Sequence, residues 1–230
     1  MENILSALSK ALSLIISLDR EVFSIVLLSF FVSLTAVFFS SLFSIPLSLL
    51  LALRKFPGNR FIVNTINSLM AVPAVAIGLV VYLLISRRGP LGVLGLLYTP
   101  WAMVIAQATL VTPIITSLSI QTLKRVGSMV KETAVSLGAS GWQVVTTLLK
   151  EAKSPLIVIF IVGFARVIGE TGMTMMVGGN IKGATRVMTT AIALETMKGD
   201  FELAVALGII LLTVAFVINI ILQAMQGAGR

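Results

Sequence analysis

Long runs without a single charged residue constrain this chain more than any other feature. Residues 22–53 and 61–86 contain no Asp, Glu, Lys or Arg. Each run is longer than the roughly 20 apolar residues that an α-helix needs to cross a bilayer. Only 11% of all residues are charged, against about 25% in soluble domains. The chain is therefore predicted to be an all-α, polytopic transmembrane protein.

The pattern predicts a bundle of five core membrane helices. The expected spans are 22–53, 61–86, 101–123, 155–177 and 203–223. Pro46 is expected to kink the first span, and Pro73 and Pro113 lie inside the second and third.

The N-terminal segment, residues 1–20, is predicted to be separate from the membrane domain, residues 21–227. Apolar residues recur at helical spacing between residues 4 and 18, with serines between them. This pattern is typical of an amphipathic helix lying in the membrane interface. An ordinary helical turn packed on the bundle is the alternative.

Several function classes are disfavoured by composition. The chain has no Cys and no His, which removes disulfides, the commonest metal ligand and the usual general base near neutral pH. We therefore expect no metal site and no self-contained enzyme. No phosphate-binding loop of the form G-x4-G-K-[ST] occurs, so ATP is not expected to bind here. The net charge of +8 is attributed to loops facing the cytoplasm, not to nucleic-acid binding.

A polar stretch, residues 124–154, separates the third and fourth spans. Ala134 and Gly138 are four residues apart, so a partner's backbone is expected to approach closely there. Gly141 and Trp142 are expected to break the helix, giving two short helices joined by a turn. From the residues alone, a solvated connecting loop is an equally good interpretation.

This stretch resembles the E-A-A-x3-G motif of permease subunits of ATP-binding cassette (ABC) importers. Glu132 and Ala134 match the first and third motif positions and Gly138 the glycine, whereas Thr133 replaces the usual second Ala. The family's later Leu-Pro is replaced by Lys150-Glu151. The run 163–201 looks like the permeases of oxyanion importers, closest to tungstate and related to molybdate, sulfate and phosphate.

The resemblance implies a fold, an activity and partners. The fold would be that of a type I importer permease, working by alternating access in a prokaryotic cell membrane. Two ATPase subunits would carry ATP and Mg, and an extracytoplasmic substrate-binding (capture) protein would deliver tungstate. Five helices are few to enclose a path, so a homodimer is expected. The coupling residues would be cytoplasmic: Glu132, Thr133, Ala134, Gly138, Ala139 and Ser140.

Rival interpretations remain open at this point. Lys and Arg residues are divided almost evenly between the two sides of the membrane, so charge alone does not set the orientation. Molybdate, sulfate or phosphate are alternative substrates. A stand-alone channel or an ion-coupled carrier is a rival of another class.

Two further sets of charged residues are candidate sites. Arg166 and Glu170 are four residues apart, so they would share a face of the fourth span near mid-bilayer. With Thr171 and Thr174 they would line the path or its gate; an ion pair that fixes helix packing is the alternative. The external loop 178–202, helical over 186–197, would dock the capture protein or be merely solvated. Its docking residues would be Lys182, Arg186 and Lys198.

Overall fold

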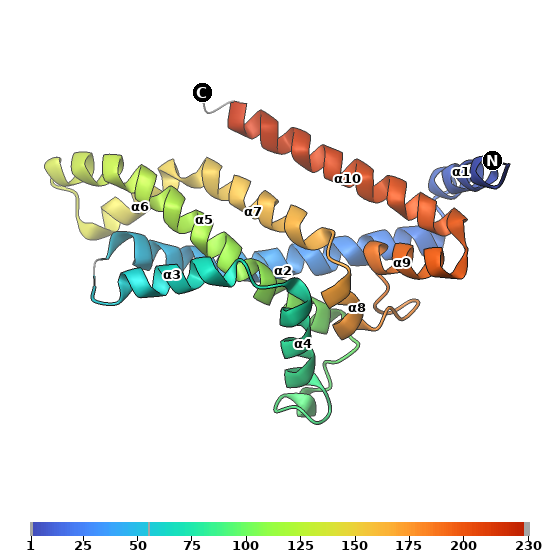
Figure 1. Ribbon diagram of the computed structural model, residues 1–230. Coiled ribbons are helices and arrows are strands. Elements are labelled where there is room, and N and C mark those ends of the chain that lie inside the picture. The colour runs from blue at the N-terminus through green and yellow to red at the C-terminus, as the bar shows by residue number, and fades with distance from the viewer. Residues whose placement is uncertain (1, 55, 228–230) are drawn as a thin grey trace.

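The computed structural model describes residues 2–54 and 56–227, except for the side chains of residues 2–7, 129, 131, 132, 135 and 227. Within these residues the chain forms α-helices and one short 3-10 helix, as predicted for an all-α protein. Figure 1 shows an elongated bundle with α4 projecting from its side. The elements are α1 (Glu2–Ile16), α2 (Arg20–Leu53), α3 (Asn59–Leu69), α4 (Ala74–Ile85), η1 (Gly92–Leu94), α5 (Pro100–Ser136), α6 (Gly141–Glu151), α7 (Lys153–Ile168), α8 (Gly172–Gly178), α9 (Met188–Lys198) and α10 (Phe201–Gly227).

Helices α2 and α5 form the centre of the bundle and run parallel. Buried hydroxyls of α2 donate to carbonyl oxygens of α5 at a constant offset of 68 residues: Ser40 to Ala108 (3.1 Å), Ser44 to Thr112 (3.3 Å) and Ser48 to Thr116 (3.0 Å). Small side chains every four residues let two backbones approach, and their hydroxyls bond across the contact. The two helices are thereby fixed in register.

Among the described residues, three helices are long and apolar enough to cross a membrane, and two bent pairs bring the number to five if each pair is one span. The second and fourth expected spans are not continuous helices. Residues 61–86 divide into α3 and α4, bent by 100°, and residues 155–177 into α7 and α8, bent by 69°. Pro73 has no N–H to donate and disfavours helix in the residue before it, which accounts for the first break. By contrast, α2 continues as a helix through Pro46.

The third expected span is longer than predicted, because α5 continues from Pro100 to Ser136. At 1.5 Å per residue this helix is about 55 Å long. The first of the two short helices expected in the polar stretch 124–154 is therefore the end of α5 and not a separate helix. Gly127 of α5 faces Leu148 of α6. A Cβ built at Gly127 would lie 3.7 Å from Leu148 Cδ2, which is van der Waals contact, so the two helices pack against each other here.

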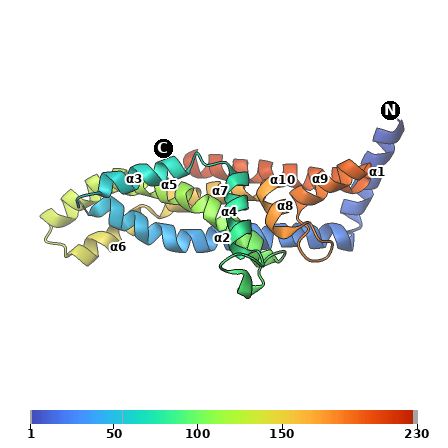
Figure 2. The same ribbon diagram turned by 60° about the horizontal axis from the view of Figure 1, so that its bottom comes forward.

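The N-terminal helix α1 has 15 residues and is too short to span a bilayer. It stands across one end of the bundle in Figure 2. There the Lys10 ammonium group pairs with the Glu202 carboxylate at the start of α10. Leu12 and Ile16 are exposed while Ala11 is buried. The segment is helical as predicted and packs on α10, whereas its position in the membrane interface stays a prediction.

Candidate coupling helix, membrane path and external ionic cluster

The turn between α5 and α6 lies at the opposite end of the bundle from α1 (Figure 1). Helix α5 ends at Ser136, and Gly138 has a φ of +77°, which L side chains rarely adopt. The expected break at Gly141-Trp142 is wrong by a few residues, because Gly141 begins α6. Ser140 caps that helix: its N–H donates to Gln143 Oε1 at 2.7 Å, and its hydroxyl accepts from the Gln143 N–H at 3.5 Å.

A small core fixes α6 to the rest of the protein. Val144 and Leu148 are buried, and Leu148 packs in a cluster with Leu123 and Ala152. On the other side, Leu137 and Trp142 are 82% and 76% exposed. We call the end of α5, the turn and α6, residues 132–151, the knob. Its two exposed large apolar side chains suit it to insertion into a groove of another protein.

The predicted coupling residues all lie on this knob. Glu132, Thr133 and Ala134 belong to the last turns of α5, and the Glu132 side chain lies outside the described residues. Gly138, Ala139 and Ser140 form the turn itself. The exposed Trp142 was not among the predicted coupling residues, although a Trp in a polar stretch was a signal that could have identified it. Together with Leu53 and Arg54 it lines a groove of about 450 Å³ between the end of α2 and α6.

Arg166 and Glu170 are brought together at the break between α7 and α8. Arg166 Nη1 lies 3.0 Å from Glu170 Oε2, and the two side chains are 43% and 13% exposed. The two residues do not share a continuous helix, because α7 ends at Ile168 and Glu170 lies in the break. The Thr189 hydroxyl of α9 donates to the Glu170 carbonyl at 3.1 Å, which ties the break to the next helix.

Two buried polar side chains near this break have unused capacity for hydrogen bonds. Gln107 of α5 donates from Nε2 to the Val167 carbonyl at 3.2 Å, which satisfies a carbonyl at the end of α7. Its Oε1, and the hydroxyl of buried Thr174, have no partner among the described residues. Thr171 is the residue before α8 and is partly exposed. Gln107 was not predicted from the sequence.

The three predicted docking residues meet in one ionic cluster, and two acidic residues, Glu21 and Glu195, complete it. Arg186 lies 3.2 Å from Glu195 and 3.6 Å from Glu21, Lys182 lies 2.6 Å from Glu21, and Lys198 lies 3.1 Å from Glu195. Arg186 and Glu195 are buried, while Lys182 and Lys198 are exposed. The two lysines thus present the charge of this cluster to solvent, and Arg186 holds it together from inside.

Comparison with known proteins assigns the chain to a family. The family described as binding-protein-dependent transport system inner membrane component matches residues 44–228. The chain belongs to this family.

Individual relatives match over most of the chain. It is 43% identical to the tungstate uptake system permease protein TupB of Peptoclostridium acidaminophilum, over 98% of this chain and 99% of that protein. It is 35% identical to a probable anion ABC transporter permease of Haloferax volcanii, over 85% and 87%. It is 37% identical to the tungstate permease TupB of Campylobacter jejuni, over 75% and 72%. Sulfate and molybdenum permeases are more distant, at 27% to 30% identity.

As a binding-protein-dependent permease, the chain is the membrane component of a transporter and not an enzyme. Its several apolar helices make it a multi-pass membrane protein, as predicted. Such an uptake system works with an ATPase and with a substrate-binding protein.

Proposed function

We propose that this permease carries tungstate into the cell, driven by ATP hydrolysis on a separate subunit. The observation that carries the proposal is the match to a tungstate permease over nearly the whole length of both chains. Molybdate, sulfate and phosphate are the alternative substrates, since molybdenum and sulfate permeases are related at lower identity.

The working unit is proposed to be a homodimer with two ATPase subunits, which bind ATP and Mg, and one capture protein. The shape of the single chain supports this. Helix α4 leaves the bundle at 100° to α3, and four of its large apolar side chains are 48% to 57% exposed. They are Val75, Leu79, Val80 and Leu83. A second copy related by a two-fold axis would cover this helix.

Alternating access is the proposed mechanism. When the ATPase subunits close on ATP, they would draw the two knobs together. Helix α5 continues without a break from the knob to Pro100 and packs against α2, α7 and α8. A displacement of the knob would therefore be transmitted as a tilt of α5 to the break between α7 and α8, where Gln107 binds the Val167 carbonyl. Hydrolysis would reverse the movement.

The path is proposed to run past that break. Arg166 would face the anion while Glu170 is neutralised by the ion pair between them. Thr171 and Thr174 would offer hydroxyl groups, and the Thr174 hydroxyl has no other partner among the described residues. On the outside, Lys182 and Lys198 would contact the capture protein.

Co-purification followed by competition tests the substrate. The native complex should contain an ATPase and a capture protein, and tungstate should displace the other oxyanions from the capture protein and from transport. Stronger competition by molybdate, sulfate or phosphate would reassign the substrate within the family.

A further inference from the structure

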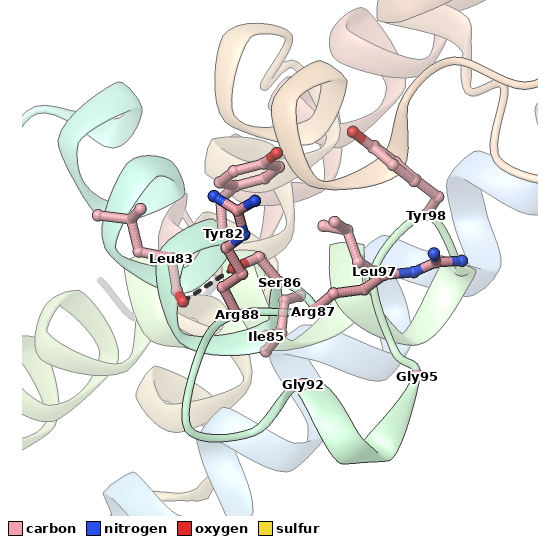
Figure 3. A pocket seen from close by; sticks show the side chains of 10 residues that line it. All are labelled: Tyr82, Leu83, Ile85, Ser86, Arg87, Arg88, Gly92, Gly95, Leu97 and Tyr98. Atoms are coloured by element: carbon pink, nitrogen blue, oxygen red, sulfur yellow. Dashed lines mark hydrogen bonds between the residues drawn. The ribbon is translucent and has the colours of Figure 1, made fainter.

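A pocket of about 630 Å³ lies where α4 ends and the chain turns back toward α5. Figure 3 shows its lining side chains: Tyr82 comes from α4, Arg87 and Arg88 follow that helix, and Tyr98 precedes α5. The sequence Arg87-Arg88-Gly89-Pro90 ends the α4 segment, and the proposed function uses neither arginine.

The loop that carries the arginines is tightly built. A Cβ at Gly89 would lie 2.1 Å from the Leu83 carbonyl oxygen, and one at Gly92 would lie 2.3 Å from that of Ser86. Only glycine fits at both positions, because the obstructing atoms are backbone. The Leu91 N–H donates back to the Leu84 carbonyl at 2.9 Å. The loop therefore presents both arginines from a defined backbone.

The pocket is positively charged and lined with hydroxyl groups. Both arginines are exposed, and neither has a carboxylate within 4.0 Å in the part of the chain that the structure describes. In Figure 3 the two arginine side chains point in different directions, Arg88 on the Tyr82 side of the pocket and Arg87 on the side of Leu97 and Tyr98. The Tyr82 side chain favours the protonated form of Tyr98 and raises its pKa, so the Tyr98 phenol keeps its proton and can donate it.

The segment that lines the pocket is attached to α8, the helix that carries Thr174 of the predicted path. The Tyr98 N–H donates to the Val177 carbonyl at 3.0 Å, at the C-terminal end of α8. At the other side of the pocket, α4 packs on α8 so closely that a Cβ at Gly78 would lie 2.9 Å from the Met173 side chain. Figure 1 and Figure 2 both show α4 and α8 side by side. Thr174 of the predicted path lies on this same helix.

We propose that the Arg87–Arg88 pocket binds the transported tetrahedral oxyanion at the external mouth of the path, after the capture protein releases it. The inference rests on the proposed function, because it takes the cargo to be an oxyanion. Unpaired guanidinium groups bind such anions through charge-assisted hydrogen bonds. A phosphate headgroup of a lipid has the same chemistry, so the test separates the two sources.

The chain has no Cys, so a single thiol reports on the pocket. We would place it by Ser86→Cys in the complex with its ATPase, in nanodiscs of zwitterionic lipid without capture protein, because a nanodisc leaves both faces of the bilayer open to the reagents. Ser128→Cys is the matched control: both serine hydroxyls donate to the carbonyl three residues earlier, and Ser128 follows Lys124 and Arg125 outside the pocket. Rates are measured with a sulfonate-bearing and a trimethylammonium-bearing methanethiosulfonate reagent. Leu97→Cys, in the same pocket, replaces S86C if that variant does not assemble.

Tungstate is expected to slow labelling at S86C and not at S128C. Adding Arg87→Gln and Arg88→Gln should abolish this protection and lower the ratio of anionic to cationic labelling rates about tenfold. An absence of protection by tungstate would overturn the proposal. Slower labelling in nanodiscs of anionic lipid without tungstate would also overturn it, because it would indicate a lipid headgroup site. So would a loss of capture-protein binding in R87Q/R88Q when tungstate gives no protection, because the arginines would then dock the capture protein. Wild-type uptake of tungstate in the complete system is measured in parallel, so that failure of the pocket is distinguished from failure of the proposed function.

Discussion

At the scale of single residues, the buried pair Arg186–Glu195 organises the end of the bundle where α2 begins. Both side chains are less than 10% exposed, and their charged atoms are 3.2 Å apart. A buried charge is tolerated only when it is paired, so each residue depends on the other. The sequence predicted Arg186 as a docking residue because Lys182, Arg186 and Lys198 lie close together in the chain. It could not show that Glu21, far away in the sequence, completes the cluster.

Glu195→Gln should destabilise the protein, because it removes the nearer and more buried countercharge of Arg186 and leaves only the longer contact with Glu21, at 3.6 Å. We expect a loss of about 3–5 kcal/mol in the free energy of unfolding, seen as a lower midpoint of thermal unfolding in detergent. The matched control is Glu202→Gln, which removes the exposed pair with Lys10 and should change the midpoint little. Equal shifts in the two variants would show that the internal pair is not the organising contact.

At the scale of helices, the sequence predicted where apolar segments lie but not how they bend. Hydropathy counts apolar residues, and a straight span and a sharply bent pair of helices have the same composition. Pro73 was noted inside the second span, and its chemistry accounts for the first break, although no break was predicted there. No comparable sequence signal marks the second break, where Gln107 and Thr189 bind the carbonyls of Val167 and Glu170. The extension of α5 to Ser136 was missed because a helix does not have to end where its residues become polar.

The turn after α5 gives a sharp test of helix-scale geometry. Gly138 has a positive φ, and Gly141, three residues later, starts α6 without one. Gly138→Ala should therefore cost about 1–2 kcal/mol locally and reduce the stimulation of ATPase activity by loaded capture protein. Gly141→Ala should leave the stimulation unchanged or slightly raised. The reverse order of effects would mean that the conformation of this turn does not set the coupling.

At the scale of the whole molecule, the two candidate surfaces lie at opposite ends of the bundle. The Lys182 cluster is attached to the start of α2 through Glu21, and the knob packs near the end of α2 at Leu53 and Arg54. The 34-residue length of α2 separates them. If the knob binds the ATPase, it lies on the cytoplasmic side, and the Lys182 cluster at the other end of α2 then faces the outside. The nearly even distribution of Lys and Arg residues could not decide this orientation.

A cysteine at each end tests this orientation. Lys182→Cys should react with an impermeant thiol reagent added to intact cells, since the Lys182 side chain is 67% exposed. Ser128→Cys, on the cytoplasmic part of α5, should react only after the cells are opened. Labelling in the opposite order would invert the topology and remove the coupling role of the knob.

Uptake into reconstituted vesicles tests the central claim, that a separate ATPase drives this permease, most directly. Vesicles would contain the permease with its ATPase and internal ATP, and receive capture protein loaded with isotopic tungstate from outside. Tungstate should accumulate against its gradient, and it should stop accumulating when ATP, the ATPase or the capture protein is left out. Entry of tungstate through the permease alone, without ATP, would contradict the claim and indicate a channel or an ion-coupled carrier.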